Sequence, residues 1–121
     1  MDGLDLDVAC EFQQLAPLRQ TVRTWLMDVG ADEEAQMSTV LATHEAVANA
    51  IGHAQPCKAV KVKGRIEDGA IVVEFTDTGT WKPLPDNDER GLGLALIAGV
   101  MSDMEIQAEP SGTTVRMSRL L

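Results

Sequence analysis

The sequence contains few aromatic and few basic residues, and this limits what the protein can bind. Its 121 residues include no Tyr, two Phe and two Trp, and 10 Lys and Arg stand against 19 Asp and Glu, for a formal charge of −9. Nucleic-acid-binding proteins neutralise phosphates with basic side chains and stack exposed rings on bases, and anionic membranes attract basic segments. The composition therefore argues against direct binding to nucleic acid or to a membrane surface.

The sequence also lacks cysteine clusters and long apolar runs. Cys10 and Cys57 are far apart and belong to no Cys/His group, so we expect neither a zinc site nor a disulfide framework. The longest uncharged stretch that we find, residues 91–102, is shorter than the roughly 17 to 25 residues that span a bilayer. The first residues do not combine a basic start with an apolar run, as signal peptides do. We therefore expect a reduced, cytoplasmic protein.

The residues that are present suffice for one folded domain. Hydrophobic residues make up 45% of the chain, and a domain of this size buries roughly two-thirds of its unfolded surface. No repeat or linker-like segment divides the sequence. We expect a single domain over residues 1–121, either a whole protein or one domain of a larger regulator.

The apolar periodicity predicts an α+β fold. Helical spacing over residues 17–30 and 32–54 predicts two helices, and residues 91–101 predict a third. Alternation predicts strands over residues 8–12, 59–66, 70–75, 104–108 and 113–118, with turns at 67–69 and 109–112. This order predicts a two-layer α/β sandwich, in which a mixed, mostly antiparallel sheet is covered on one face by about three helices.

The second predicted helix carries an apolar and a polar stripe. Glu45, Asn49 and His53 follow each other at intervals of four residues and therefore lie on one side of the helix. They form either a solvated face or a site, because an Asn oxygen can bind Mg²⁺ and a Glu can deprotonate a hydroxyl. The residues that we expect to face the core, with His44 as a core histidine, are Met37, Val40, Leu41, His44, Val47, Ala48 and Ile51.

Three further segments have two interpretations each. Asp77 and Gly79 follow an apolar strand, where a carboxylate can accept a hydrogen bond from an amino group such as that of adenine, or simply form a turn. Residues 90–93, Arg-Gly-Leu-Gly, open the third helix, where backbone N–H groups can bind an anion or merely be capped. Thr113 and Thr114 begin the last strand and can support Asp77.

The four segments together resemble the GHKL ATP-binding superfamily, which has the Bergerat fold, and within it the anti-sigma factor serine kinases. Residues 45–54 resemble the N-box of that family, 77–79 and 90–94 its two glycine boxes, and 112–114 its last motif. The resemblance covers residues 10–120. It implies a two-layer sandwich that binds ATP and Mg²⁺.

The resemblance also implies a role for each residue. Asn49 would coordinate Mg²⁺, Glu45 would be the general base that activates a serine hydroxyl, and Asp77 would bind the adenine amino group. Gly79 would line the ring, and Thr113 or Thr114 would assist through water. The implied phosphate contacts are Arg90, Gly91, Leu92 and Gly93, and His53 would support the site.

The implied function is an anti-sigma factor that phosphorylates a STAS-type anti-anti-sigma protein, with a homodimer as an expected state. One alternative is a non-catalytic module that binds these partners, which the short lid over residues 80–90 favours. Thr80-Trp81 stands in place of the Gly-Phe pair of many relatives and is similar to a variant of members attached to serine phosphatase or STAS modules. The catalytic domain of a histidine kinase ranks lowest. Residues 1–57 carry 9 acidic and 2 basic residues, and we expect this half to dock on the basic surface of a sigma factor.

Overall fold

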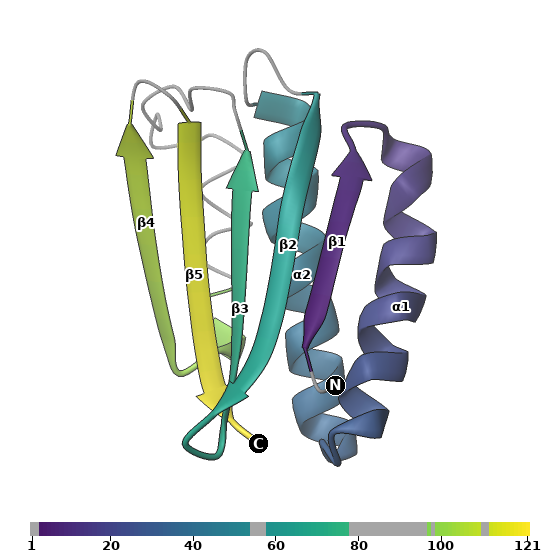
Figure 1. Ribbon diagram of the computed structural model, residues 1–121, viewed down its shortest axis with the longest axis vertical. Coiled ribbons are helices and arrows are strands. Elements are labelled where there is room, and N and C mark those ends of the chain that lie inside the picture. Colours follow the sequence, from purple (N-terminus) through teal and green to yellow (C-terminus); the bar gives the residue numbers. More distant parts are fainter. Residues whose placement is uncertain (1–2, 54–57, 78–96, 98, 110–111) are drawn as a thin grey trace.

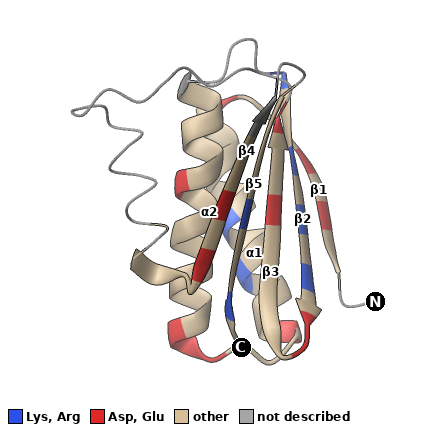
Figure 2. Cartoon of the chain, turned by 90° about the vertical axis from the view of Figure 1, so that its left-hand side faces the viewer, with Lys and Arg blue, Asp and Glu red and all other residues tan. Residues whose placement is uncertain are grey.

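The protein folds into a five-stranded sheet with helices on one face, and this confirms the predicted two-layer α+β architecture (Figures 1 and 2). The structure is a computed structural model, and it describes residues 3–53, 58–77, 97, 99–109 and 112–121. The elements are β1 (Leu4–Ala9), the 3-10 helix η1 (Phe12–Gln14), α1 (Leu15–Asp28), α2 (Glu33–His53), β2 (Ala59–Glu67), β3 (Ala70–Asp77), β4 (Asp103–Glu109) and β5 (Gly112–Leu120).

The strand order is β1-β2-β3-β5-β4, and all four neighbouring pairs are antiparallel. The predicted sheet was mixed and mostly antiparallel, whereas all neighbours among the described strands are antiparallel. The reason is that β4 runs in the same direction as β3 but does not pair with it, because β5 lies between them. Of the third predicted helix, the structure describes residues 97 and 99–101, of which 97, 99 and 100 are helical. Ile97 and Met101 belong to the hydrophobic core, and the Met101 N–H donates to the Ile97 carbonyl at 2.9 Å.

The first strand begins earlier than predicted. Its alternation comes from Leu4 and Val8, which are buried, and from Asp5 and Asp7, which lie opposite Lys63 and Lys61 of β2. Opposite charges across neighbouring strands favour this register. The prediction of a strand over residues 8–12 missed the alternation of leucine with aspartate. The last residue of that predicted strand, Phe12, belongs instead to η1.

The first two predicted helices form, with ends close to the predicted ones. Gly30 has φ of +85°, a conformation that ends helices readily when glycine supplies it, and the Ala31 N–H returns to the Leu26 carbonyl at 2.9 Å. The Asp32 carboxylate accepts a hydrogen bond from the Ala35 N–H at 2.8 Å and so caps the start of α2. The chain therefore reverses between α1 and α2 within a few residues.

The buried side of α2 differs from the prediction. Met37 is 69% exposed and Leu41 is 38% exposed, although both belong to the predicted apolar stripe. Small side chains let a helix approach a sheet closely, and on α2 these are the residues that are buried. The prediction instead followed the long apolar residues. The residues that are at most 2% exposed on α2 are mostly small: Ala35, Thr39, Ala42, Thr43, Ala46, Val47 and Ala50.

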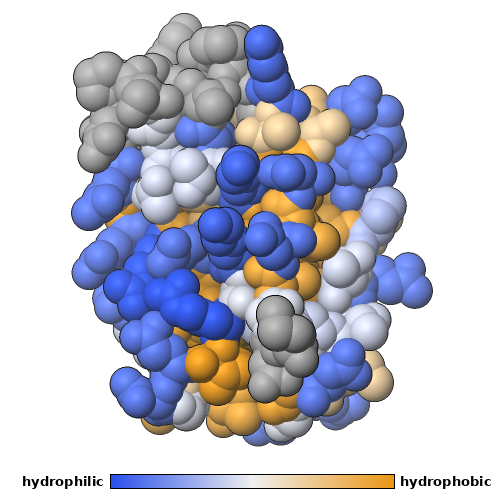
Figure 3. Space-filling view, in the orientation of Figure 1, coloured by the Kyte–Doolittle hydropathy of each residue, from blue (hydrophilic) through white to orange (hydrophobic). Residues whose placement is uncertain are grey.

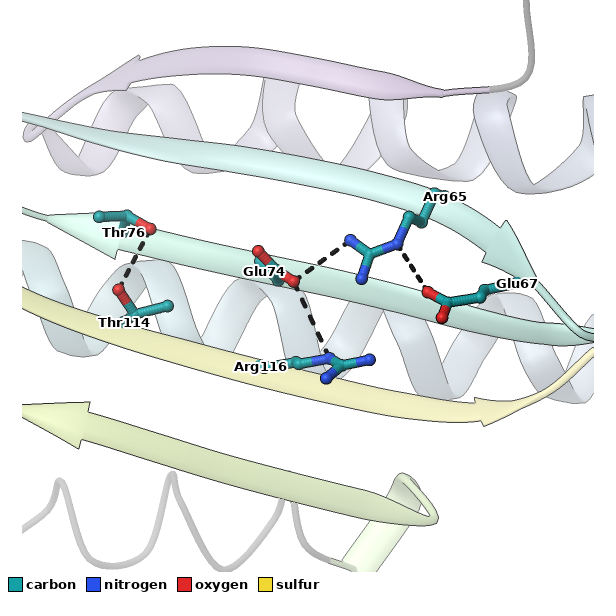
Figure 4. Close-up of polar contacts among 6 residues, drawn as sticks. All are labelled: Arg65, Glu67, Glu74, Thr76, Thr114 and Arg116. Atoms are coloured by element: carbon teal, nitrogen blue, oxygen red, sulfur yellow. Dashed lines mark hydrogen bonds and ion pairs between the residues drawn. The ribbon is translucent and has the colours of Figure 1, made fainter.

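The open face of the sheet is polar and ion-paired (Figures 3 and 4). Arg65 bonds Glu67 at 2.8 Å and Glu74 at 3.2 Å, and Arg116 approaches Glu74 at 3.9 Å. The Arg65 hydrogen bond lowers the pKa of Glu67 below its usual range. In Figure 3, hydrophilic side chains stand over the middle of this face with apolar surface between and below them. Such charge ladders keep the uncovered face of a sheet in solvent.

Cys10 is disulfide-bonded, which corrects the expectation of unpaired cysteines. The sequence has one other cysteine, Cys57, which lies outside the described residues. The Cys10 N–H donates to the Lys58 carbonyl at 3.1 Å, so the pairing of β1 with β2 brings Cys10 beside the residue that follows Cys57 in the sequence. The sequence does not show that Cys10 and Lys58 lie close together, because only the pairing of β1 with β2 brings these two segments together. In the described part of the chain, no helix is long and apolar enough to cross a membrane.

Candidate functional site

Three of the predicted nucleotide-binding residues lie at the same end of the molecule. At this end, uppermost in Figure 1, α2 and β3 end and β5 begins. Asn49 lies one turn before the last residue of α2, Asp77 is the last residue of β3, and Thr113 is the second residue of β5. Asp77 and Thr113 are direct partners across the β3–β5 pair, and α2 packs against both strands.

These three polar side chains are almost completely buried. Asn49 is 6%, Asp77 4% and Thr113 1% exposed. Among the described residues, Asn49 Nδ2 and Thr113 Oγ1 have no hydrogen-bond partner. A buried polar group without a partner costs roughly 1–3 kcal/mol. Asn49 and Thr113 both carry this cost at the same end of the molecule, beside the buried carboxylate of Asp77. This end is therefore suited to bind a polar ligand.

Thr113 and Thr114 face opposite sides of the sheet. Thr114 Oγ1 lies 3.4 Å from Thr76 Oγ1 on the open face, where Figure 4 shows the pair next to the Glu74 ion pairs. Thr113 shares the buried side with Asp77, because side chains alternate along a strand. Of the two threonines proposed from sequence, only Thr113 therefore lies on the side of the sheet that α2 covers.

The predicted polar stripe of α2 divides into a buried and an accessible part. Asn49 is buried, whereas Glu45, one turn earlier, is partly exposed and lines a groove between α1 and α2 together with Arg19 and Arg23. The stripe is therefore not a uniformly solvated face. A hydroxyl that approaches from outside can reach Glu45 without entering the protein interior.

The remaining predicted contacts lie outside the described residues. These are Gly79, Arg90, Gly91, Leu92 and Gly93, together with the lid over residues 80–90 and the side chain of His53, which ends α2. Their roles toward the phosphates stay predictions.

Asn49 is the residue at this end that would hold a magnesium ion together with a nucleotide. Among the described residues, no group of three or more His, Cys, Asp or Glu could hold a metal ion. Mg²⁺ keeps several waters and commonly binds substrate phosphates with one or two protein oxygens. An amide oxygen of Asn49 suits that role, since it adds a ligand without adding another negative charge.

His44 is not the core histidine that the sequence predicted. It is partly exposed and lines the same groove as Glu45, and its Nδ1 lies 3.0 Å from Arg19 Nη1. Since a guanidinium only donates hydrogen bonds, His44 Nδ1 is the acceptor. A sequence signal for this groove existed: Arg19 and Arg23 are the two basic residues among the first 57, and they stand one helical turn apart.

Comparisons with known proteins agree with the fold and with the family that the sequence resembles. Residues 8–119 match the family described as "Histidine kinase-like ATPase domain". Anti-sigma F factors of two Clostridium botulinum strains, Eklund 17B and Alaska E43, are each 28% identical over 134 residues, which cover 96% of this chain and 92% of theirs.

Solved structures share the fold at lower identity. The crystal structure of the RsbU and RsbW domains of Rv1364c from Mycobacterium tuberculosis superposes with a TM-score of 0.83 at 23% identity, covering 98% of this chain. This chain spans 32% of that longer one. The histidine kinase domain of Erythrobacter litoralis EL346 gives a TM-score of 0.60 at 15% identity, over 93% of this chain and 61% of the other.

Proposed function

Because the chain belongs to the histidine kinase-like ATPase domain family, we propose that it binds ATP with Mg²⁺ and transfers the terminal phosphate to a serine of a protein partner. The observation that carries the proposal is the burial of Asn49, Asp77 and Thr113 at one end of the fold. Asn49 Nδ2 and Thr113 Oγ1 are two of the four buried side-chain atoms that lack partners among the described residues. These polar groups do not stabilise an apolar core, whereas a nucleotide would offer them hydrogen-bond partners.

Each residue has a definite task in this proposal. Asp77 accepts a hydrogen bond from the adenine amino group, Thr113 supports it, and Asn49 offers an oxygen to Mg²⁺. The ion, when bound, neutralises charge on the phosphates. Glu45 takes the proton of the serine hydroxyl as the serine oxygen bonds to the terminal phosphorus. The bond from that phosphorus to the bridging oxygen breaks, and ADP leaves with the electron pair.

The proposed biological role is that of an anti-sigma factor in the cytoplasm. Its support is the similarity to anti-sigma F factors over 92% of their length. The proposed partners are a sigma factor, which the protein holds inactive, and a STAS-type protein, which it phosphorylates. A homodimer belongs to the same proposal.

The first test concerns nucleotide binding. Isothermal titration with ATP and ADP, with and without Mg²⁺, compares wild type with Asp77→Asn, which keeps the shape of the side chain and removes the acceptor charge. We expect a loss of affinity of about ten-fold or more, since a hydrogen bond to a charged group contributes roughly 1.5–3 kcal/mol. Glu74→Gln is the matched control, because Glu74 lies on the same strand but among the ion pairs of the open face. Equal affinities of both variants would contradict the proposed adenine contact.

The second test separates the kinase from the non-catalytic alternative. Labelled ATP is incubated with the protein and a cognate STAS partner, and the phosphoserine product is quantified. Glu45→Gln should abolish transfer while ATP still binds, and Glu34→Gln, at the exposed start of the same helix, should leave transfer intact. Partner binding without transfer in the wild type, indifferent to ATP and to Asn49→Ala, would instead assign the chain to the non-catalytic binding modules.

A further inference from the structure

The strand β1 forms one edge of the sheet, and no other described strand than β2 pairs with it. Its pairing with β2 runs without a bulge over Leu4–Ala9, and the strand contains no proline. Natural proteins commonly shield edge strands with proline, bulges or a covering element, because their free N–H and C=O groups can pair with another chain. The outer edge of β1 has neither proline nor a bulge, so its backbone is suited to pair with a further strand.

The register shows which backbone groups of β1 face outward. The Cys10 N–H donates to the Lys58 carbonyl at 3.1 Å. In an antiparallel pair, successive residues alternately bond the neighbouring strand and point away from it. Residues 4, 6 and 8 therefore bond β2, whereas the N–H and C=O groups of Asp5 and Asp7 point toward the free edge. The two-residue turn between β2 and β3 requires the same alternation.

Two hollows follow this edge, on the side where α1 lies beside β1 (Figure 1). Their volumes are about 390 and 130 Å³, and Thr21 of α1 lines both. β1 contributes Leu4 to the larger hollow and Leu6 to the smaller one. The hydroxyls of Thr21 and Thr24 donate to carbonyls one turn earlier in α1, at 3.0 Å each, so their methyl groups remain to contact a ligand. A strand added to β1 would therefore also lie against α1.

The charges on the open face indicate what such a strand carries. One row of direct neighbours crosses all five strands with alternating charge: Asp5, Lys63, Glu74, Arg116 and Glu105. Opposite charges across neighbouring strands are stabilising, and like charges are destabilising. A sixth strand that continues the row next to Asp5 is therefore basic at that position. A second copy of β1 would instead place aspartate opposite aspartate.

We propose that β1 docks an extended segment of a partner protein as a sixth, antiparallel strand in which basic residues alternate with apolar ones. The basic residues stand opposite Asp5 and Asp7, and their backbone bonds the outward N–H and C=O groups of these two residues. The apolar residue between them stands opposite Leu6 and contacts Thr21 of α1. β2 has the same alternating pattern over residues 60–63 and pairs with the inner edge of β1.

This surface includes none of the residues Asn49, Asp77 and Thr113. The proposal therefore goes beyond the proposed function and does not rest on nucleotide binding or on the kinase reaction. Either one can fail while the other holds.

The test uses the full chain and a short synthetic peptide in which lysine alternates with valine. One form is N-methylated on the lysines, which removes the N–H groups that would donate to the Asp5 and Asp7 carbonyls. The other form is N-methylated on the valines, whose N–H groups point to solvent in the proposed pairing. Both forms carry the same charge and the same side chains. We expect the valine-methylated form to bind about ten-fold more tightly in titration calorimetry, because it keeps the hydrogen bonds to β1.

Amide hydrogen exchange locates the bound peptide. The amide protons of Asp5 and Asp7 should exchange rapidly in the free protein and slow down as the peptide saturates it, whereas the Leu6 amide, which bonds β2, should be slow in both states. The double variant Asp5→Asn/Asp7→Asn should weaken binding about five-fold. Glu105→Gln, the matched loss of charge on the other edge strand, β4, should leave the affinity unchanged. Should the double variant melt well below wild type, the two methylated peptides test the proposal on the wild-type protein.

Several outcomes would overturn the proposal. One is equal affinity for the two methylated peptides, and another is a peptide that binds while exchange at Asp5 and Asp7 stays unchanged. A loss of affinity in Glu105→Gln as large as in the double variant would place the peptide on β4. Protection of Asp5 and Asp7 that rises with protein concentration alone would assign the edge to a second copy of this chain.

Discussion

Replacing Thr113 by valine should make the free protein more stable and its nucleotide complex weaker. The side chain is 1% exposed, and its hydroxyl has no partner among the described residues. Valine has nearly the same shape, so the substitution removes the unpaired hydroxyl without opening a cavity. A buried unpaired polar group costs roughly 1–3 kcal/mol, and we expect a gain at the lower end, about 1 kcal/mol.

The size of the effect follows from the length of the chain. Unfolding entropy is about 2.1 cal/mol/K per residue, so for 121 residues a gain of about 1 kcal/mol raises the Tm by about 4 °C. The lost nucleotide contact should cost about 1 kcal/mol, or roughly five-fold in the Kd for ATP. Calorimetric melting without ligand and titration with Mg-ATP measure the two quantities on the same samples.

Thr43→Val is the matched control. Thr43 is 0% exposed, and its hydroxyl also lacks a partner in the part of the chain that the structure describes. It lies in α2, six residues before Asn49. This variant should gain similar stability and bind ATP like wild type. If Thr113→Val were less stable than wild type by more than about 1 kcal/mol, or bound ATP unchanged, the reasoning that connects the orphaned hydroxyl with the nucleotide would be refuted.

Three further predictions concern packing, pH and metal. A Cβ at Gly64 would lie 2.8 Å from a buried tryptophan ring, so Gly64→Ala should lower the free energy of unfolding by about 1–2 kcal/mol in urea titrations, whereas Gly99→Ala, which meets nothing within 4 Å, should not. Because the Arg65 hydrogen bond lowers the pKa of Glu67, the small stability difference between wild type and Glu67→Gln should be present at pH 7 and be lost as the pH falls below the usual pKa of a glutamate and through the lowered pKa of Glu67. Chelation of Mg²⁺ should weaken ATP binding less in Asn49→Ala than in wild type, as titration calorimetry can measure.

The acidic residues of the first half, which the charge count suggested as a docking surface, lie on different parts of the fold. Asp5 and Asp7 stand opposite Lys63 and Lys61 on the sheet, where each charge is partly compensated. The acidic residues that begin α2, Asp32 to Glu34, lie at the end away from Asn49, as the red segments in Figure 2 show.

The sequence by itself determined the order of the described helices and strands and pointed to the candidate nucleotide-binding residues. Local signals sufficed where the cause is local. The Asp32 cap begins α2, and Asp68 and Gly69, with φ of 52° and 77°, make the turn between β2 and β3. Local signals also sufficed for two parts of the candidate site. Glu45 and Asn49 follow each other on one helix, and Asp77 ends one strand, so each part lies within a single element.

Only the tertiary structure decided which side chains share a face or a groove. Thr113 rather than Thr114 joins Asp77 because the register of β5 against β3 sets the pleat. His44 leaves the core because the small residues of α2 pack most closely, which turns the long apolar ones toward α1 and solvent. Cys10 is bonded because β1 pairs with β2. These are contacts between distant segments, and one sequence carries no local signal for them.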